Sequence, residues 1–252
     1  MRIKILLGTL LLTAVSVFAD IKSARILTDN PDINYAIFNL NSIENQGLCG
    51  ALENMIIGLD KERNRLFDIV EVGDSTLKIE DFFMTDNRLV VKSDNVVLWT
   101  DGKNTDAIKL EDANFSLKAA SDSSFFVIRI SPSEIFEFSL SDKKPILHLP
   151  HFEPIISVFR QDDLIVVVSE KNIMGYAENQ WFLLHNHPYA ITTASFTPLG
   201  LFCGTEYGFW RLTDFEEIEL YGELAVKKLM SDGATLYLID GEDNIYALEF
   251  ED

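Results

Sequence analysis

The histidines are the residues of this chain whose type and spacing most readily suggest chemistry. All four lie between residues 148 and 187, as two close pairs: His148 with His151, and His185 with His187. An imidazole nitrogen can bind a transition metal, and an imidazole can gain or lose a proton near neutral pH. The four histidines are therefore the candidate metal ligands of the sequence.

Motifs that would indicate catalysis do not occur in the sequence. There is no glycine-rich phosphate loop, no His-Glu-x-x-His helix and no Gly-x-Ser-x-Gly elbow. With 40 aspartates and glutamates in the chain, neighbouring carboxylates arise by chance, and pairs such as Asp162 and Asp163 fall in predicted turns. We therefore expect no catalytic residue and no cofactor.

The two cysteines, Cys49 and Cys203, each precede a glycine near the start of a predicted strand. An oxidising compartment would favour a disulfide between them. They lie in the first and fifth of six sequence repeats, which are not adjacent in a ring. We expect two buried free thiols, with a disulfide as the alternative.

These residues are carried by a pattern of apolar runs and polar turns that recurs six times. The second apolar run of each repeat begins at Leu48, Leu89, Phe125, Leu164, Leu201 and Leu236. The spacing is close to the length of a four-stranded propeller blade. It predicts an all-β fold, a single β-propeller that most simply has six four-stranded blades.

The fourth repeat shows the predicted blade most clearly. β-Branched and aromatic runs at 155–159, 164–168, 173–177 and 181–184 alternate with turns rich in Asp, Asn and Glu. The last repeat has only three strands, and a further strand is predicted at 24–27. We expect this N-terminal strand to pair with the C-terminal blade and close the ring.

The first repeat is the least regular part of the pattern. A strand is predicted at 32–35, and a long turn is predicted from Leu40 to Gly47. Rings of five or seven blades remain alternatives, as do a β-sandwich and two smaller β domains, which similar strand signals would also produce.

In a propeller, the histidines would fall in two consecutive connections between blades, on one rim of the ring. His151 and His187 would be equivalent, each four residues before the first strand of the next blade, with Glu153, Tyr189 and Glu223 nearby. Neighbouring imidazoles could hold a metal there. The alternative is that a rim simply requires polar residues.

The three tryptophans, Trp99, Trp181 and Trp210, fall in predicted strands. Packing between neighbouring blades is their expected role. Any aromatic side chains exposed around the axis would instead offer a protein-binding patch.

The first 19 residues lie outside the repeats and have the features of a secretory signal peptide. Arg2 and Lys4 precede an apolar run that is shorter than the about 20 residues of a spanning helix, and Val17 and Ala19 fit a cleavage site. We expect cleavage after Ala19, which divides the chain into a signal peptide, 1–19, and one propeller domain, 20–252. The product would be periplasmic, without a membrane span.

The charge of the chain excludes nucleic acid as a partner. The formal charge is −19, and it becomes −21 when Arg2 and Lys4 are removed with the signal peptide. Such a charge repels nucleic acid and anionic lipid, and it attracts basic proteins and cations. Because 47% of the residues are hydrophobic, the acidic residues belong to the surface of a folded domain.

The segment from Gly200 to Leu212, which reads Gly-Leu-Phe-Cys-Gly-Thr-Glu-Tyr-Gly-Phe-Trp-Arg-Leu, resembles the repeat of sensor-type and WD40-like bacterial propellers. With a signal peptide that ends in Phe-Ala before Asp20, the chain is similar to the periplasmic WD40-like accessory proteins encoded with nitrate reductase. The resemblance implies a propeller and an accessory role, and it assigns no functional residue.

Two functions are compatible with these observations. The first is a non-catalytic, monomeric scaffold that binds another periplasmic protein, such as a respiratory enzyme. The second is a propeller that binds a metal or small ligand at the histidine rim, with a hydrolase or lyase activity as one possibility.

Overall fold

A computed structural model of the chain describes residues 21–26, 39–43, 47–60, 65–72, 76–85, 88–215, 217–233 and 235–250. The predicted signal peptide, residues 1–19, and the strand predicted at 32–35 lie outside the described residues.

The described strands form six antiparallel four-stranded sheets, which we number as blades 1 to 6. Blade 1 contains β2 (Asn39–Ile43), β3 (Gly47–Leu52), β4 (Met55–Asp60) and β5 (Arg65–Glu71). Blade 2 contains β6 (Asp81–Met84), β7 (Leu89–Ser93), β8 (Val96–Thr100) and β9 (Thr105–Lys109). Blade 3 contains β10 (Phe115–Ser121), β11 (Ser124–Arg129), β12 (Glu134–Ser139) and β13 (Pro145–Pro150). Blade 4 contains β14 (Ile155–Gln161), β15 (Leu164–Ser169), β16 (Asn172–Ala177) and β17 (Gln180–Asn186). Blade 5 contains β18 (Ile191–Thr197), β19 (Gly200–Thr205), β20 (Gly208–Thr213) and β21 (Glu217–Gly222). Blade 6 contains β22 (Val226–Ser231), β23 (Thr235–Asp240), β24 (Ile245–Phe250) and β1 (Ile21–Ile26).

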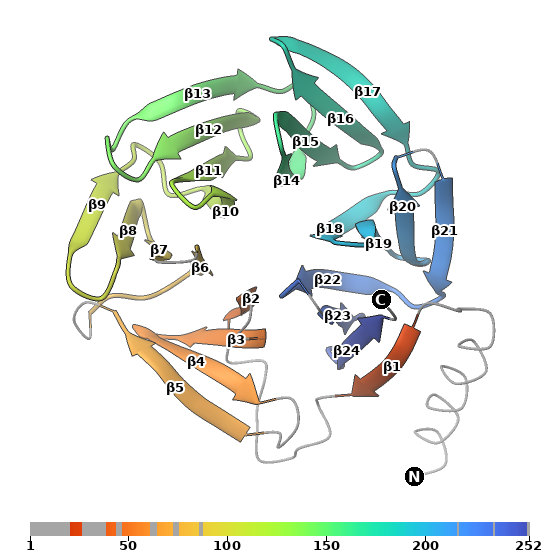
Figure 1. The fold of residues 1–252 in the computed structure, drawn as a ribbon, viewed down its shortest axis with the longest axis horizontal. Helices are drawn as coiled ribbons and strands as arrows, with labels where there is room; N and C mark the ends of the chain where they lie inside the picture. The colour runs from red at the N-terminus through yellow and green to blue at the C-terminus, as the bar shows by residue number, and fades with distance from the viewer. Residues whose placement is uncertain are drawn as a thin grey trace.

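The blades surround a common axis, which confirms the predicted six-bladed β-propeller (Figure 1). The first strand named for each blade is the innermost one. In blade 6 this strand is β22, and β1 is the outermost. Neighbouring inner strands contact one another in the closed order β2, β6, β10, β14, β18, β22 and back to β2. The chain therefore forms a ring and not a sandwich.

The ring is closed by the N-terminal strand, as predicted. β1 pairs antiparallel with β24, with Ala24 opposite Leu248, and it supplies the fourth strand of blade 6. This pairing covers an edge of β24 that would otherwise present unpaired backbone groups.

The long turn predicted from Leu40 to Gly47 is wrong, because β2 occupies Asn39–Ile43. The sequence of β2 is mostly polar, and its polar side chains bond to the neighbouring blades. The Asn41 amide donates to the carbonyl of Phe82 in blade 2, and the Ser42 hydroxyl donates to the carbonyl of Ser231 in blade 6 over 2.7 Å. These bonds let a polar segment serve as an inner strand.

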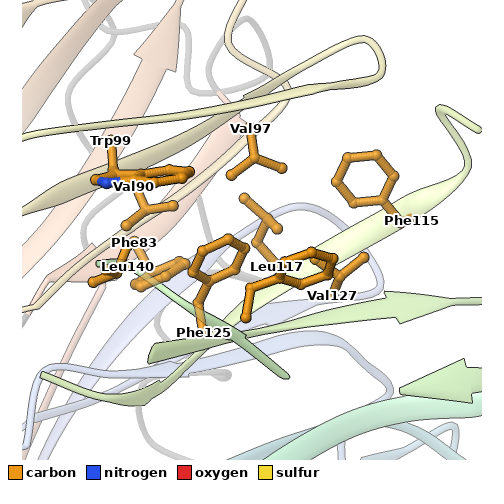
Figure 2. Packing of buried hydrophobic residues seen from close by; sticks show 10 residues of the cluster. Phe83, Val90, Val97, Trp99, Phe115, Leu117, Phe125, Val127 and Leu140 are labelled. Atoms are coloured by element: carbon orange, nitrogen blue, oxygen red, sulfur yellow. The ribbon is translucent and has the colours of Figure 1, made fainter. Parts of the chain in front are cut away.

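The hydrophobic core lies between the blades. Each of six described clusters of buried side chains joins two neighbouring blades. In the cluster between blades 2 and 3, the Phe125 and Trp99 rings lie close together (Figure 2), with their centroids 5.9 Å apart. The Phe125 ring also stacks on that of Phe138, with centroids 5.7 Å apart. Complete burial of one such side chain contributes about 1.5–3 kcal/mol, so the blades stabilise one another.

Candidate functional site

One face of the ring carries the connections between blades and the turns that follow the second strand of each blade. Backbone hydrogen bonds tie these two sets of loops together: the His151 N–H donates to the carbonyl of Ser133 over 2.9 Å, and the His187 N–H donates to the carbonyl of Lys171 over 2.7 Å. We call this side the connection face. His151 and His187 lie on it, in consecutive connections, as predicted.

The two connections hold their histidines in the same way. His151 Nδ1 lies 2.9 Å from the carbonyl oxygen of Glu153, and His187 Nδ1 lies 2.9 Å from the carbonyl oxygen of Tyr189. The backbone N–H of Glu153 and that of Tyr189 also lie 3.2 Å from these Nδ1 atoms, so the connection engages each ring through Nδ1. Each ring also meets a tryptophan edge-on, His151 against Trp181 and His187 against Trp210. The equivalence predicted from the repeat is therefore confirmed.

Both rings are buried, at 8% exposure for His151 and 1% for His187. Their Nε2 atoms have no hydrogen-bond partner among the described residues. Burial lowers the pKa of His187, and the charge of nearby His185 lowers it further, while the bond to the Tyr189 carbonyl opposes the shift. His187 is therefore neutral near pH 7, which is the form that can ligate a metal.

The other two histidines do not lie in connections, so that part of the prediction is wrong. His148 belongs to β13 and His185 to β17, because both outer strands extend further than the sequence indicated. His148 stacks on Phe136 and its Nε2 lies 3.1 Å from a carboxylate oxygen of Glu134. This histidine is engaged within its own blade.

The structure brings His185 and His187 together, with ring centroids 6.1 Å apart, and the Nε2 atom of His185 also lacks a described partner. Across the described part of the chain, however, no group of three or more His, Cys, Asp or Glu side chains is arranged to hold a metal ion. Two imidazoles could supply at most a partial ligand set.

A second feature of the connection face is a row of exposed apolar side chains on blades 3, 4 and 5. Ile130 and Tyr207 lie in turns after second strands, and Phe152 and Tyr189 lie in connections. Their exposed fractions are 50% for Ile130, 64% for Tyr207, 74% for Phe152 and 38% for Tyr189. We call these four residues the apolar arc.

The apolar arc is held by the packing beneath it. Tyr189 stacks on Trp210, with ring centroids 5.3 Å apart, and touches Tyr207 at 5.2 Å. Phe152 stacks on the buried ring of His151 at 4.8 Å. The histidines and Trp210 thus form a rigid base that presents exposed aromatic rings to solvent, and large rigid rings are effective contacts in protein interfaces.

The connection face also carries many carboxylates. The exposed acidic residues in the turns and connections of this face are Glu53, Glu80, Asp94, Glu111, Asp112, Glu170, Glu206, Glu223, Glu242 and Asp243. The exposed lysines in the same described loops are Lys78 and Lys171. The face therefore combines apolar contact area with a negative rim.

Three of the four residues of the apolar arc were not anticipated as site residues. In the sequence, such residues can be recognised as large apolar side chains placed in a turn or connection, where packing within a strand does not explain them. Phe152 stands between His151 and Glu153, and Tyr207 follows Glu206 in a tight turn. The tryptophans, in contrast, lie in strands as predicted, at Trp99 in β8, Trp181 in β17 and Trp210 in β20.

Comparisons with known proteins identify the fold alone. No protein-family model matches the chain, and no curated protein matches it. Among solved structures, a chain from "Crystal Structure of Mitotic Checkpoint Complex" is similar, with a TM-score of 0.60 and 11% sequence identity over 93% of each chain. In all, 1009 solved chains are similar, so the propeller by itself does not indicate a particular activity. The described residues include no helix long and apolar enough to cross a membrane.

Proposed function

We propose that this chain is an exported, non-catalytic propeller that binds another periplasmic protein as a scaffold or accessory factor. The observation that carries the proposal is the apolar arc. In the described residues, the other exposed large apolar side chains, Ile146, Phe182 and Leu183, lie on the outer strands of blades 3 and 4. Exposed apolar side chains clustered on one face and rimmed by polar groups are typical of a protein interface.

A respiratory enzyme such as nitrate reductase is the proposed class of partner. Its support is the general similarity of the chain, a propeller preceded by an expected signal peptide that ends in Phe-Ala before Asp20, to the periplasmic WD40-like accessory proteins encoded with nitrate reductase. The similar solved chain comes from a structure titled as a complex, so a propeller of this shape does operate within a protein assembly. The propeller would act as a monomer that presents a rigid face.

The experiment is affinity capture of partners by residues 20–252 from the periplasm of the host, analysed by mass spectrometry. Phe152→Ser and Tyr207→Ser remove apolar area from the arc, and each should abolish capture of the partner that the unmodified chain retains. Leu183→Ser is the matched control, because Leu183 is 57% exposed but lies on an outer strand. Equal capture by all three variants would overturn the proposal.

The acidic rim gives this proposal a second readout. Negative groups around the arc should accelerate the association with a basic partner, and the association rate should fall as salt rises from 20 to 300 mM, because about 0.15 M salt screens charges beyond roughly 8 Å. An association rate that does not change with salt would show that the rim does not steer the partner.

The second candidate function, a metal site on the histidine rim, is favoured by the free Nε2 atoms of His185 and His187. It predicts stoichiometric zinc or copper in the purified protein, lost in His187→Ala. A preparation in which metal content is unaffected by that substitution would contradict this candidate.

A further inference from the structure

The sequence contains one Asn-x-Ser/Thr motif, Asn114-Phe115-Ser116, which neither candidate function uses. In no other place along the chain is an asparagine followed two residues later by serine or threonine. This motif is the acceptor for N-linked glycosylation, which adds a bulky polar glycan to a surface asparagine of a secreted protein. The motif is meaningful only where the fold presents the asparagine to solvent.

Asn114 lies in the connection between β9 of blade 2 and β10 of blade 3, on the connection face. At the start of this connection, the Leu110 N–H donates to the carbonyl of Asn95 over 2.8 Å, and the Asn95 amide donates to the carbonyl of Leu110 over 3.0 Å. At its end, Phe115 is buried in the core between blades 2 and 3. Both ends are therefore anchored, and the connection is held at the surface of the ring.

The turn at Asn114 is built without the amide of its side chain. The Asn114 N–H donates to a carboxylate oxygen of Asp112 over 2.8 Å, and the Phe115 N–H donates to the carbonyl of Ala113 over 3.1 Å. Asn114 is exposed, and its side-chain amide makes no hydrogen bond within the part of the chain that the structure describes. A glycan on this amide would extend into solvent without displacing a contact of the fold.

We propose that Asn114 is N-glycosylated in the exported protein, a proposal that rests on the proposed export. In the reaction, the Asn114 side-chain nitrogen forms a bond to the anomeric carbon of an oligosaccharide carried on a polyprenyl pyrophosphate. The bond between that carbon and the pyrophosphate oxygen breaks, the polyprenyl pyrophosphate leaves, and a base of the transferase takes one amide proton. The exposed carboxylate of Asp112 offers the transferase an ionic contact beside the motif.

The serine of the motif indicates when the transfer would take place. Ser116 is half-buried in β10, where it lies opposite Ile128 of β11. Because the motif requires the serine as well as the asparagine, the transferase would act before β10 pairs with β11, while the exported chain is still folding. The folded ring would then keep the glycan outside.

The glycan would lie beside the apolar arc. Phe115 is opposite Arg129 in the pairing of β10 with β11, so Asn114 lies at the same end of blade 3 as Ile130. Phe152 and Tyr207 are carried by later loops of the ring. A glycan on Asn114 would therefore form a polar boundary on the blade 3 side of the arc.

The test is mass spectrometry of the full chain, expressed with a C-terminal affinity tag in its own host and purified from the periplasmic fraction. Trypsin cleaves after Lys109 and Lys118, so residues 110–118 form one peptide that contains the motif. We expect this peptide to carry the additional mass of an oligosaccharide and to release sugar fragment ions on dissociation.

Substitutions within the motif separate the asparagine from its surroundings. Asn114→Gln and Ser116→Ala should both give a peptide without the added mass, whereas Ser116→Thr keeps the hydroxyl and should keep the glycan. Asn104→Gln is the matched control, because Asn104 is exposed in the preceding turn but lies outside any such motif. It should leave the glycan in place.

A periplasmic chain that has lost residues 1–19 and whose 110–118 peptide has only its unmodified mass would overturn this proposal and leave the proposed export standing. An unmodified chain that keeps residues 1–19 and stays in the cytoplasm would overturn both. A glycan that persists in Asn114→Gln would place the modification elsewhere and would also contradict the assignment.

Discussion

Cys49 and Cys203 show how burial decides the behaviour of a residue. Both thiols are buried and unpaired. Burial raises the pKa of Cys49 to about 12, with a smaller contribution from the charge of Asp232, and burial also raises the pKa of Cys203. Thiolate is the reactive form, so both residues should be inert in the folded protein.

A thiol titration with Ellman's reagent checks this prediction. At pH 8 the folded protein should release no chromophore within minutes, and after unfolding in guanidinium chloride it should release two equivalents. No thiol after unfolding would instead indicate the disulfide that the sequence left open as the alternative.

His187 should make stability depend on pH. Because its pKa is lowered in the folded state, the unfolded chain takes up a proton first as the pH falls below about 6.5, and stability is lost from there toward the folded pKa. Between pH 7 and 5.5, the free energy of unfolding should fall more steeply than in His187→Gln, by up to about 1.4 kcal/mol per pH unit.

Chemical denaturation at several pH values measures this difference. Asn114→Gln is the control, because Asn114 is exposed and carries no titratable group, so its replacement should leave the slope unchanged. Parallel slopes for the unmodified protein and His187→Gln would contradict the assignment of the pH dependence to His187.

At the scale of the element, the hairpin of β19 and β20 depends on a glycine. Gly208 has a φ of +155°, and a Cβ there would lie 2.1 Å from the carbonyl oxygen of Gly222. Gly208→Ala should therefore reduce the free energy of unfolding by about 3 kcal/mol. In Gly241→Ala the new Cβ meets the Ala225 Cβ at an ordinary 3.5 Å, so the loss should stay within about 0.5 kcal/mol. Equal losses in urea denaturation would contradict this.

Strand positions were predictable wherever each blade carries its own apolar runs. In blade 4 the four predicted strands differ from β14, β15, β16 and β17 by at most two residues at either end. The sequence of β2 gave no such signal, because its strand depends on bonds from Asn41 and Ser42 to other blades. Contacts of that kind, far apart in sequence, have no local pattern.

The strand β1 should stabilise the whole ring. A chain that begins at residue 27 lacks β1 and leaves the edge of β24 unpaired, so it should melt at a lower temperature and self-associate through that edge. Thermal denaturation and sedimentation velocity of chains 20–252 and 27–252 test this. A synthetic peptide of residues 20–26 should restore part of the stability. Identical melting temperatures and a monomeric short chain would contradict a closing role.

At the scale of the whole molecule, the ring could be predicted because six similar repeats must bury their faces against one another. The face that carries the connections followed from this topology, and so did the equivalence of His151 and His187. The apolar arc did not, because exposure is a property of the assembled ring. Phe152 in a connection and Phe125 in a strand are the same residue type, yet only the fold leaves one of them 74% exposed and the other fully buried.

The proposed function places the contact with a partner on the apolar arc. Photo-crosslinking from single positions tests it most directly, with p-benzoylphenylalanine placed at Phe152, Tyr207, Leu183 or Ile146 of residues 20–252 and the protein irradiated in periplasmic extract of the host. We expect one common protein adduct from positions 152 and 207 and none from positions 183 and 146, which lie on the outer strands. An adduct that forms from 183 or 146 but not from 152 or 207 would contradict it.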